Sequence, residues 1–284
     1  PNIVDHAVAN PGLSSLVAAL TDGGNTTFTD LLSNEEELFT VFAPGNDAFS
    51  AFTNPNSNDI NAILANHVVM GAAAFRSDLT STYYTTEAEF ATDENLSLYV
   101  NIDDGVTLNG TSSVVMADIV ASNGVIHTVD AVIDLPTVVT FATADPTFST
   151  LVQALTELTP STDFVSVLSA QDGAGSDPFT VFAPTNDAFA ALASIPGEAD
   201  LTPILQHHVV AGANVRSGDL SDGATATTLE GDMITINLPG TGDNIADITD
   251  GAGNTGIGID AVDVQAINGV IHVVDTVLIP DTSN

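Results

Sequence analysis

Lysine is absent from this 284-residue sequence, and arginine occurs only at Arg76 and Arg216, against 37 aspartate and glutamate residues. The formal net charge at pH 7 is -35. A protein that binds nucleic acid needs clustered cations to neutralise phosphates, and binding to an anionic membrane needs a similar cluster. The composition therefore excludes nucleic acid and anionic membranes as direct partners. Because salt screens the repulsion between carboxylates, we expect a halophilic or marine source.

Cysteine is absent as well, which excludes disulfides, thiolate metal sites and a cysteine nucleophile. No apolar run approaches the roughly 20 residues that cross a bilayer as a helix. Hydrophobic residues nevertheless make up 44% of the chain, which is enough to build hydrophobic cores and argues against disorder.

The common sequence motifs of enzymes are missing too. The chain has no Gly-x-Ser-x-Gly nucleophile elbow, no His-Glu-x-x-His zinc motif, no Walker loop and no dinucleotide-binding glycine pattern. Carboxylate pairs carry no information, because acidic residues occur throughout the chain. We therefore expect a protein that is not an enzyme.

Four sequence blocks occur twice in the same order, which indicates duplication of one folding unit. The matching blocks are residues 10–20 and 145–155, 39–49 and 179–189, 67–71 and 208–212, and 123–130 and 268–275. The offset between copies drifts slowly along the chain, as small loop insertions would cause. The repeats predict two tandem domains, residues 1–136 and 137–284.

Within each repeat, helical patterns come first and strand patterns come later. Apolar residues at helical spacing follow a proline-containing start, at Leu13, Leu16, Val17 and Leu20 and again at Phe148, Leu151, Val152 and Leu155. A second helix is predicted over residues 59–66, with Asn58 as its N-cap. This order predicts an α+β fold in each repeat, with helices packed against a small sheet.

Two strand predictions complete this pattern. Residues 39–42 form a short apolar run that ends at Ala-Pro, as a buried strand would. Residues 114–121 and 125–133 flank Ser-Asn-Gly, and Asn-Gly favours the positive φ angles of a tight hairpin turn. We therefore expect an antiparallel hairpin near the end of the first repeat.

The repeated blocks resemble the signature of the fasciclin domain family. They read Phe-Thr-Val-Phe-Ala-Pro-x-Asn-Asp-Ala-Phe, His-Val-Val-x-Gly and Asn-Gly-Val-Ile-His-x-Val-Asp-x-Val. The resemblance covers essentially the whole chain, once per repeat. It implies a β-wedge or sandwich with helices packed against it, an extracellular or cell-surface location, and a role in cell adhesion or matrix interaction without catalysis.

The resemblance leaves the partner open between a protein and a glycan at a cell surface or matrix. A second hypothesis is a structural building block, a homo-oligomer that assembles into a surface layer or filament with divalent cations as bridges. Family members often carry Tyr-His at the central motif, whereas this chain has Asn66-His67 and His207-His208. A partner that depends on this tyrosine should therefore not be assumed for this chain.

The residues of the central motif allow two interpretations. Asn66, His67, His207 and His208 are candidate binding residues at a surface. Alternatively, His67 and His208 are buried where a helix meets a strand, with ring nitrogens bonded to backbone, because Val-Val follows each of them. We expect His127 and His272 to be hydrogen-bonded structural residues at the edge of the core.

Arg76 and Arg216 are expected at equivalent positions of the two repeats, because they lie 140 residues apart (216 - 76). We expect structural ion pairs, although an anion clamp is the functional alternative. The candidate acidic partners are Asp78 and Asp219, or Asp47 and Asp187. The last two belong to the pairs Asn46-Asp47 and Asn186-Asp187, which we expect to cap the helix that follows each of them.

An insertion in the second repeat is rich in aspartate and glycine. Its oxygen ligands could bind Ca²⁺, and the candidates are Asp243, Asp247, Asp250 and Asn254. The spacing matches neither of the common calcium-loop patterns, so a solvated loop is the alternative. The Asp/Gly-rich stretches at residues 22–27 and 172–177 receive the same interpretation. No other cofactor is indicated.

Overall fold

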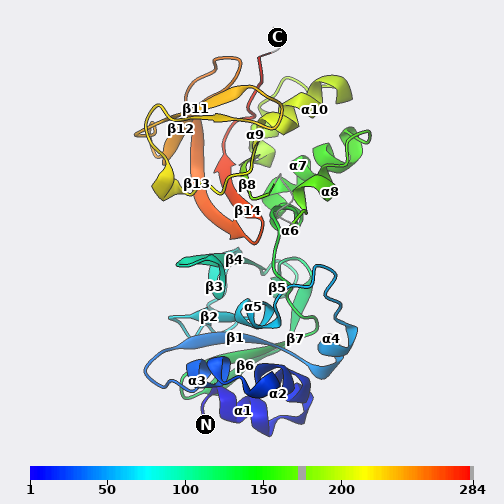
Figure 1. Cartoon of the computed structure of the whole chain (residues 1–284), viewed down its shortest axis with the longest axis vertical. Coiled ribbons are helices and arrows are strands. Elements are labelled where there is room, and N and C mark those ends of the chain that lie inside the picture. The colour runs from blue at the N-terminus through cyan, green and yellow to red at the C-terminus, as the bar shows by residue number, and fades with distance from the viewer. Residues whose placement is uncertain (172–176, 282–284) are drawn as a thin grey trace. The chain divides into compact units, whose positions relative to one another are not determined.

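The chain divides into two compact units, which we call unit 1 (Pro1–Pro136) and unit 2 (Thr137–Asn284). This computed structural model describes residues 1–171 and 177–281. Each unit contains its own seven-stranded sheet together with short helices (Figure 1). The predicted α+β class is therefore confirmed.

The helices of unit 1 precede and interrupt its strands. They are α1 (Ile3–Ala9), η1 (Pro11–Leu13), α2 (Ser14–Leu20), η2 (Asp22–Gly24), α3 (Thr27–Leu32), α4 (Asn46–Ala51) and α5 (Ile60–Ala65). The strands are β1 (Phe39–Pro44), β2 (Val68–Met70), β3 (Thr82–Ala91), β4 (Glu94–Asn101), β5 (Thr107–Leu108), β6 (Ser112–Ala121) and β7 (Gly124–Val129).

Unit 2 repeats this order with a longer insertion. Its helices are α6 (Val138–Ala144), η3 (Pro146–Phe148), α7 (Ser149–Gln153), η4 (Ala154–Leu158), α8 (Phe164–Leu168), α9 (Asn186–Ala190), α10 (Glu198–His207) and η5 (Ser217–Asp219). Its strands are β8 (Phe179–Pro184), β9 (Val209–Ala211), β10 (Thr225–Thr227), β11 (Met233–Asn237), β12 (Ala246–Thr249), β13 (Ile257–Ala266) and β14 (Gly269–Val274).

The second and the fourth repeated sequence blocks contribute neighbouring strands to the sheet of each unit. In unit 1 the strand order is β2-β1-β7-β6-β5-β4-β3, and β1 pairs with β7 in parallel from Phe39↔Gly124 to Pro44↔Val129. Strands β8 and β14 pair in the same way in unit 2. The other strand pairs are antiparallel. Parallel pairing between the ends of the repeat was not predicted from local patterns.

The predicted helical stripe is confirmed, because Leu13, Leu16 and Leu20 are all buried. Their helices lie against β1 and β7 on one side of unit 1, and β3 and β4 lie on the other side (Figure 1). A second apolar cluster, centred on Phe42, Leu98 and Val129, fills the space between the strands. Strands β1 and β7 therefore have apolar packing on both faces.

The prediction of Asn58 as an N-cap was wrong by one residue. Asp59 is the N-cap of α5, and its carboxylate accepts hydrogen bonds from the backbone N–H groups of Asn61 and Ala62. Asn58 instead donates from Nδ2 to Oδ1 of Asp134 at 3.0 Å. Either side chain can cap a helix, and the distant carboxylate determined which of them does so.

The predicted hairpin is present, but Asn123 and Gly124 do not form its two-residue turn. Ala121 pairs with Gly124, so Ser122 and Asn123 form the turn and Gly124 begins β7. Gly124 has φ +154°, and a Cβ atom there would lie 2.1 Å from the carbonyl oxygen of Phe39. Glycine is therefore required because β1 approaches closely.

Asn123 is fully buried and ties the helices to this hairpin. Its Nδ2 donates to the carbonyl oxygens of Leu32 (2.8 Å) and Asn34 (3.0 Å), and its Oδ1 accepts from the N–H of Ile3 (3.0 Å). Asn268 makes the matching three bonds in unit 2.

Among the described residues, no single helix has the length and apolar character to cross a membrane. One bent helix pair, Ile3–Ala9 with Pro11–Leu20, meets both criteria when its two parts are taken together, across a bend of 98°.

Candidate functional site

The central histidine of each repeat lies buried where a helix meets a strand. His67 follows α5 and is 2% exposed; its Nδ1 donates to the carbonyl oxygen of Ile63 at 2.7 Å, and its Nε2 accepts from the N–H of Ile133 at 2.9 Å. His208 makes the same pair of bonds, to Ile204 at 2.8 Å and from Leu278 at 2.9 Å. Each ring therefore links the helix to the segment that closes its unit.

Burial controls the charge of these rings. It lowers the pKa of His67 to about 4, against a smaller opposing effect of the bond to the Ile63 carbonyl. Burial also lowers the pKa of His208 to about 4. Both rings are neutral at pH 7 and offer no free nitrogen, so they cannot contact a partner directly in this conformation. The structural alternative describes them correctly.

The residue before each histidine is buried too, and it differs between the units. Asn66 donates from Nδ2 to the carbonyl oxygen of Asp134 at 3.0 Å and accepts from the hydroxyl of Thr86 at 3.2 Å. Both Asn66 and His207 are inaccessible to solvent. The surface interpretation of Asn66, His67, His207 and His208 is therefore corrected, because a recognition residue must reach solvent.

His207 joins two loops of unit 2. Its Nε2 accepts from the N–H of Gly251 at 3.0 Å, which places the proton on Nδ1, 3.0 Å from Oε2 of Glu230 and 3.1 Å from Oγ1 of Thr228. A histidine beside a carboxylate and a hydroxyl resembles a catalytic arrangement, but both ring nitrogens are already occupied. Sequence reasoning missed Glu230 and Thr228, and no local pattern marks them.

The second histidine pair lies on the sheet. Nε2 of His127 donates to the carbonyl oxygen of Ala74 at 2.9 Å, and its Nδ1 accepts from the N–H of Asp118 at 3.3 Å. His272 makes only the first kind of bond, to Val215 at 2.8 Å, and its buried Nδ1 has no partner among the described residues. The expectation that both ring nitrogens are hydrogen-bonded is therefore confirmed for His127, but it is wrong for Nδ1 of His272. Burial lowers the pKa of both rings.

The two arginines are not equivalent in the structure. The carboxylate of Asp78 accepts from the N–H of Phe75, and that of Asp219 accepts from the N–H of Arg216. The structural offset is therefore 141 residues (216 - 75), and Arg76 corresponds to Ser217. The predicted equivalence was wrong by one residue, because unit 2 has one more residue between the block at 179–189 and the block at 208–212 than unit 1 has between the matching blocks.

The predicted ion-pair partners were also wrong. Nη2 of Arg216 lies 3.8 Å from Oδ2 of Asp263, not beside Asp219 or Asp187. The guanidinium of Arg76 is exposed and makes no ion pair with any described residue, so neither Asp78 nor Asp47 neutralises it.

Asn46 and Asn186 act as caps, but not of the helices they begin. Asn46 is the first residue of α4, whose N-cap is Gly45. Its Oδ1 accepts from the N–H of Ser15 at 2.9 Å, and its Nδ2 donates to the carbonyl oxygen of Pro11 at 2.9 Å. Asn46 therefore caps α2 although it lies 31 residues further along the chain, and Asn186 does the same for α7.

Asp47 and Asp187 lie exposed in the first turns of α4 and α9. There they complement the positive end of the helix dipole. The prediction of a local cap by these four residues is corrected, because the asparagines reach a preceding helix.

The candidate calcium ligands do not converge. Asp250 accepts from the N–H and Nδ2 of Asn254 and from the N–H of Ile279. Asp247 accepts from Nδ2 of Asn244 and from the N–H of Thr241. No group of three or more histidine, aspartate or glutamate residues is placed to hold a metal ion in the described ranges, which leave out most of the 172–177 stretch. The candidate set Asp243, Asp247, Asp250 and Asn254 is therefore corrected, because its members do not form one ligand cluster and Asp247 and Asp250 accept hydrogen bonds within the loop.

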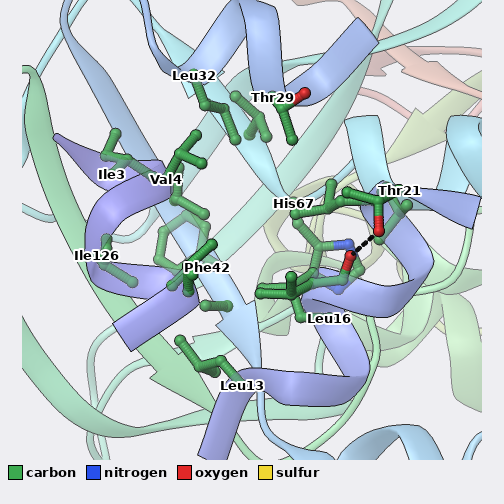
Figure 2. Close-up of a pocket in the computed structure, with 18 residues that line it drawn as sticks. Ile3, Val4, Leu13, Leu16, Thr21, Thr29, Leu32, Phe42, His67 and Ile126 are labelled. Atoms are coloured by element: carbon green, nitrogen blue, oxygen red, sulfur yellow. Dashed lines mark hydrogen bonds between the residues drawn. The ribbon is translucent and has the colours of Figure 1, made fainter. Parts of the chain in front are cut away.

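Each unit has an apolar crevice between its first helices and the central strands. In unit 1 it measures about 60 Å³ and is lined by residues that include Ile3, Leu16 and Phe42 (Figure 2). The hydroxyl of Thr21 donates to the carbonyl oxygen of Val17 in its own helix, and both ring nitrogens of His67 are bonded to backbone groups. The unit 2 crevice measures about 40 Å³. Ligand pockets usually measure about 300–1,000 Å³, so these crevices are gaps in helix packing.

Comparison with known proteins identifies the repeat. The fasciclin domain family matches residues 11–136 and 146–280. Protein sll1483 of Synechocystis sp. is 38% identical over 156 residues, which covers 51% of this chain and 73% of that protein. Human periostin is 28% identical over 307 residues, which covers 99% of this chain but only 33% of periostin.

A solved structure shares the fold of both units. It is a FAS1 domain pair from the insect cell adhesion molecule Fasciclin I, with a TM-score of 0.58 and 21% sequence identity. The match covers 95% of this chain and 98% of that one. Tandem repetition of this domain is therefore a shared architecture.

Proposed function

The chain belongs to the fasciclin domain family, and we propose that it is a non-enzymatic adhesion or matrix-interaction protein at the cell surface or outside the cell. The observation that carries this proposal is the match of the whole tandem arrangement to a domain pair of a cell adhesion molecule. The buried histidines support it, since the most reactive side chains of the chain serve the fold.

The partner is a protein or a glycan, bound through exposed loops and strand edges. Binding of purified matrix proteins and glycans to the immobilised full chain tests this function. We expect saturable binding to at least one of them, above that to an unrelated protein of similar acidity. Equal retention on both surfaces would contradict the proposal, because charge alone would then explain it.

A second candidate is a self-assembling structural block. The observation that favours it is a group of exposed apolar side chains on β6, namely Val115, Met116 and Val120. Light scattering after size exclusion, with and without Ca²⁺, tests this candidate. A monomer under both conditions removes it.

A further inference from the structure

The two units differ most clearly at one face of the sheet, beside the segment that follows β2 or β9. In unit 1 this face, which we call the β6 face, consists of Ala73, Phe75, Arg76, Asp118 and Val120. The corresponding residues of unit 2 are Asn214, Arg216, Ser217, Asp263 and Gln265. The correspondence follows from matching hydrogen bonds. Thr40 donates to the carbonyl oxygen of Ala72 in unit 1, as Thr180 does to that of Ala213 in unit 2. Likewise, His127 bonds to the carbonyl oxygen of Ala74, as His272 does to that of Val215.

In unit 2 the polar groups of this face satisfy one another. Asn214 and Gln265 exchange two hydrogen bonds, at 3.2 and 2.9 Å, and Gln265 is fully buried. Asp263 accepts from the N–H and hydroxyl of Ser217, and its Oδ2 also lies 3.8 Å from Arg216. The polar side chains of this face therefore find their partners within unit 2 itself.

In unit 1 most of the side chains at the corresponding positions are exposed, and they make fewer polar contacts with one another. Val120 replaces the buried glutamine and is 60% exposed, and Phe75 is 37% exposed. The guanidinium of Arg76 has no ion pair among the described residues. Asp118 is 42% exposed; its Oδ1 accepts from the N–H of Arg76, and its Oδ2 accepts no hydrogen bond from the described part of the chain.

At this one position of the fold, the polar Gln265 of unit 2 is buried whereas the apolar Val120 of unit 1 is exposed. This is the reverse of the usual distribution, in which apolar residues are buried and polar residues are exposed. Exposed apolar area costs free energy unless another surface covers it. Arginine and aromatic residues, here Arg76 and Phe75, are also enriched at protein interfaces. The β6 face therefore has the composition of an interface that is not yet covered.

The strand edge beside this face is also unpaired. Of the residues of β6, strand β5 pairs only with Ser112 and Ser113, so in the described chain no strand pairs with the second edge of residues 115–121. Register shifts on either side of Met116 make this edge irregular. Such bulges prevent open-ended strand addition, which favours a closed contact of limited size.

We propose that the β6 face is the contact between two copies of this chain, in which Arg76 of each copy pairs with Asp118 of the other. The proposal rests on the second candidate function, self-association, and assigns its surface. A two-fold contact brings the same patch of both copies together, so the free guanidinium and the free carboxylate oxygen satisfy each other reciprocally. Phe75 and Val120 are covered in the same contact.

Charge sets the conditions for this contact. Two chains of net charge -35 repel each other, and salt screens that repulsion. Pairing of copies therefore strengthens as NaCl is added. Binding of a basic foreign protein to the same face would weaken under the same change.

Sedimentation velocity of the full chain, at several protein and NaCl concentrations, tests the proposal. Two variants copy the closed face of unit 2: Val120→Gln, and the pair Phe75→Arg with Arg76→Ser. Because unit 2 folds with these residues in place, we expect both variants to fold. We expect the dissociation constant of the pair to rise by about tenfold or more in each, a loss of about 1.4 kcal/mol.

The matched control is Val8→Gln, which changes an equally exposed valine on α1 and should leave the association unchanged. A wild-type chain that stays monomeric at every salt concentration overturns both the proposal and the self-association candidate. Association that persists unchanged in both face variants overturns the β6 face alone and leaves self-association standing. Association that weakens with added NaCl also overturns the proposal.

Discussion

At the scale of single residues, the buried histidines stabilise the fold only while they are neutral. His67 and His208 each donate one hydrogen bond and accept another, which requires one proton per ring. A second proton would place an N–H opposite the N–H of Ile133 or Leu278. Protonation is therefore coupled to loss of the closing segment of each unit.

We predict that lowering the pH destabilises the chain through these rings. The folded pKa of each is about 4 and the unfolded value is about 6.5, so the unfolded chain binds more protons as the pH falls below 6.5. The stabilisation is complete above pH 6.5 and is lost progressively toward pH 4, by up to about 3 kcal/mol per histidine. Urea denaturation between about pH 7 and pH 5 measures this loss.

The double variant His67→Gln with His208→Gln should show a shallower pH dependence, with the remaining slope due to the other groups whose pKa folding shifts, among them His127 and His272. His6→Gln is the control, because His6 belongs to neither junction. A double variant with the same slope as the wild type would refute the assignment.

At the scale of elements, long-range side-chain contacts and close backbone approach hold the short helices and strands in place. Asn46 caps α2 across 31 residues, and Asn123 fixes the start of α1 and the end of α3. Short isolated helices are marginal in water, so these contacts compensate for helix length. The parallel strand pair depends on glycine at the start of β7 and of β14.

We predict that Gly269→Ala disrupts the pairing of β14 with β8. A Cβ atom at Gly269 would lie 2.2 Å from the carbonyl oxygen of Phe179, so one strand must move. We expect the free energy of unfolding to fall by about 3 kcal/mol, measured by chemical denaturation. Gly218→Ala in the same unit is the matched control, because open space surrounds that position. Equal losses in the two variants would show that the close approach is unimportant.

At the scale of the whole molecule, acidic charge dominates the energetics. Only two cations oppose 37 carboxylates, and one of them, Arg76, has no acidic partner among the described residues. Fixed repulsion of this kind destabilises compact states and falls with ionic strength. We propose on this basis that the chain is adapted to saline surroundings.

We predict that the melting temperature rises as NaCl is added from low ionic strength. CaCl₂ and MgCl₂ at matched ionic strength should act equally, because the aspartates of the unit 2 insertion accept backbone and amide hydrogen bonds. Differential scanning calorimetry measures both effects. A flat response to NaCl would contradict the charge argument, whereas a response to Ca²⁺ alone would restore a specific calcium site.

Local patterns in the sequence determined the α+β class, the buried stripe of α2 and the strand at Phe39. These features depend on residues a few positions apart, whose spacing alone decides which face is apolar. The buried histidines of the central motif were also predictable as structural residues, because Val-Val follows each of them. The family resemblance rested on the same blocks.

The tertiary structure alone decided which distant groups meet. Strand β1 pairs with β7, Asn46 caps α2, and Arg216 pairs with Asp263 while Arg76 has no acidic partner among the described residues. The polar residues of the sheet face bond to one another in unit 2, whereas most of the corresponding residues of unit 1 are exposed. The partners in these contacts lie tens of residues apart, so their meeting depends on the packing of the whole unit. The sequence shows that a buried polar side chain needs a hydrogen-bond partner, but only the fold determines which residue that partner is.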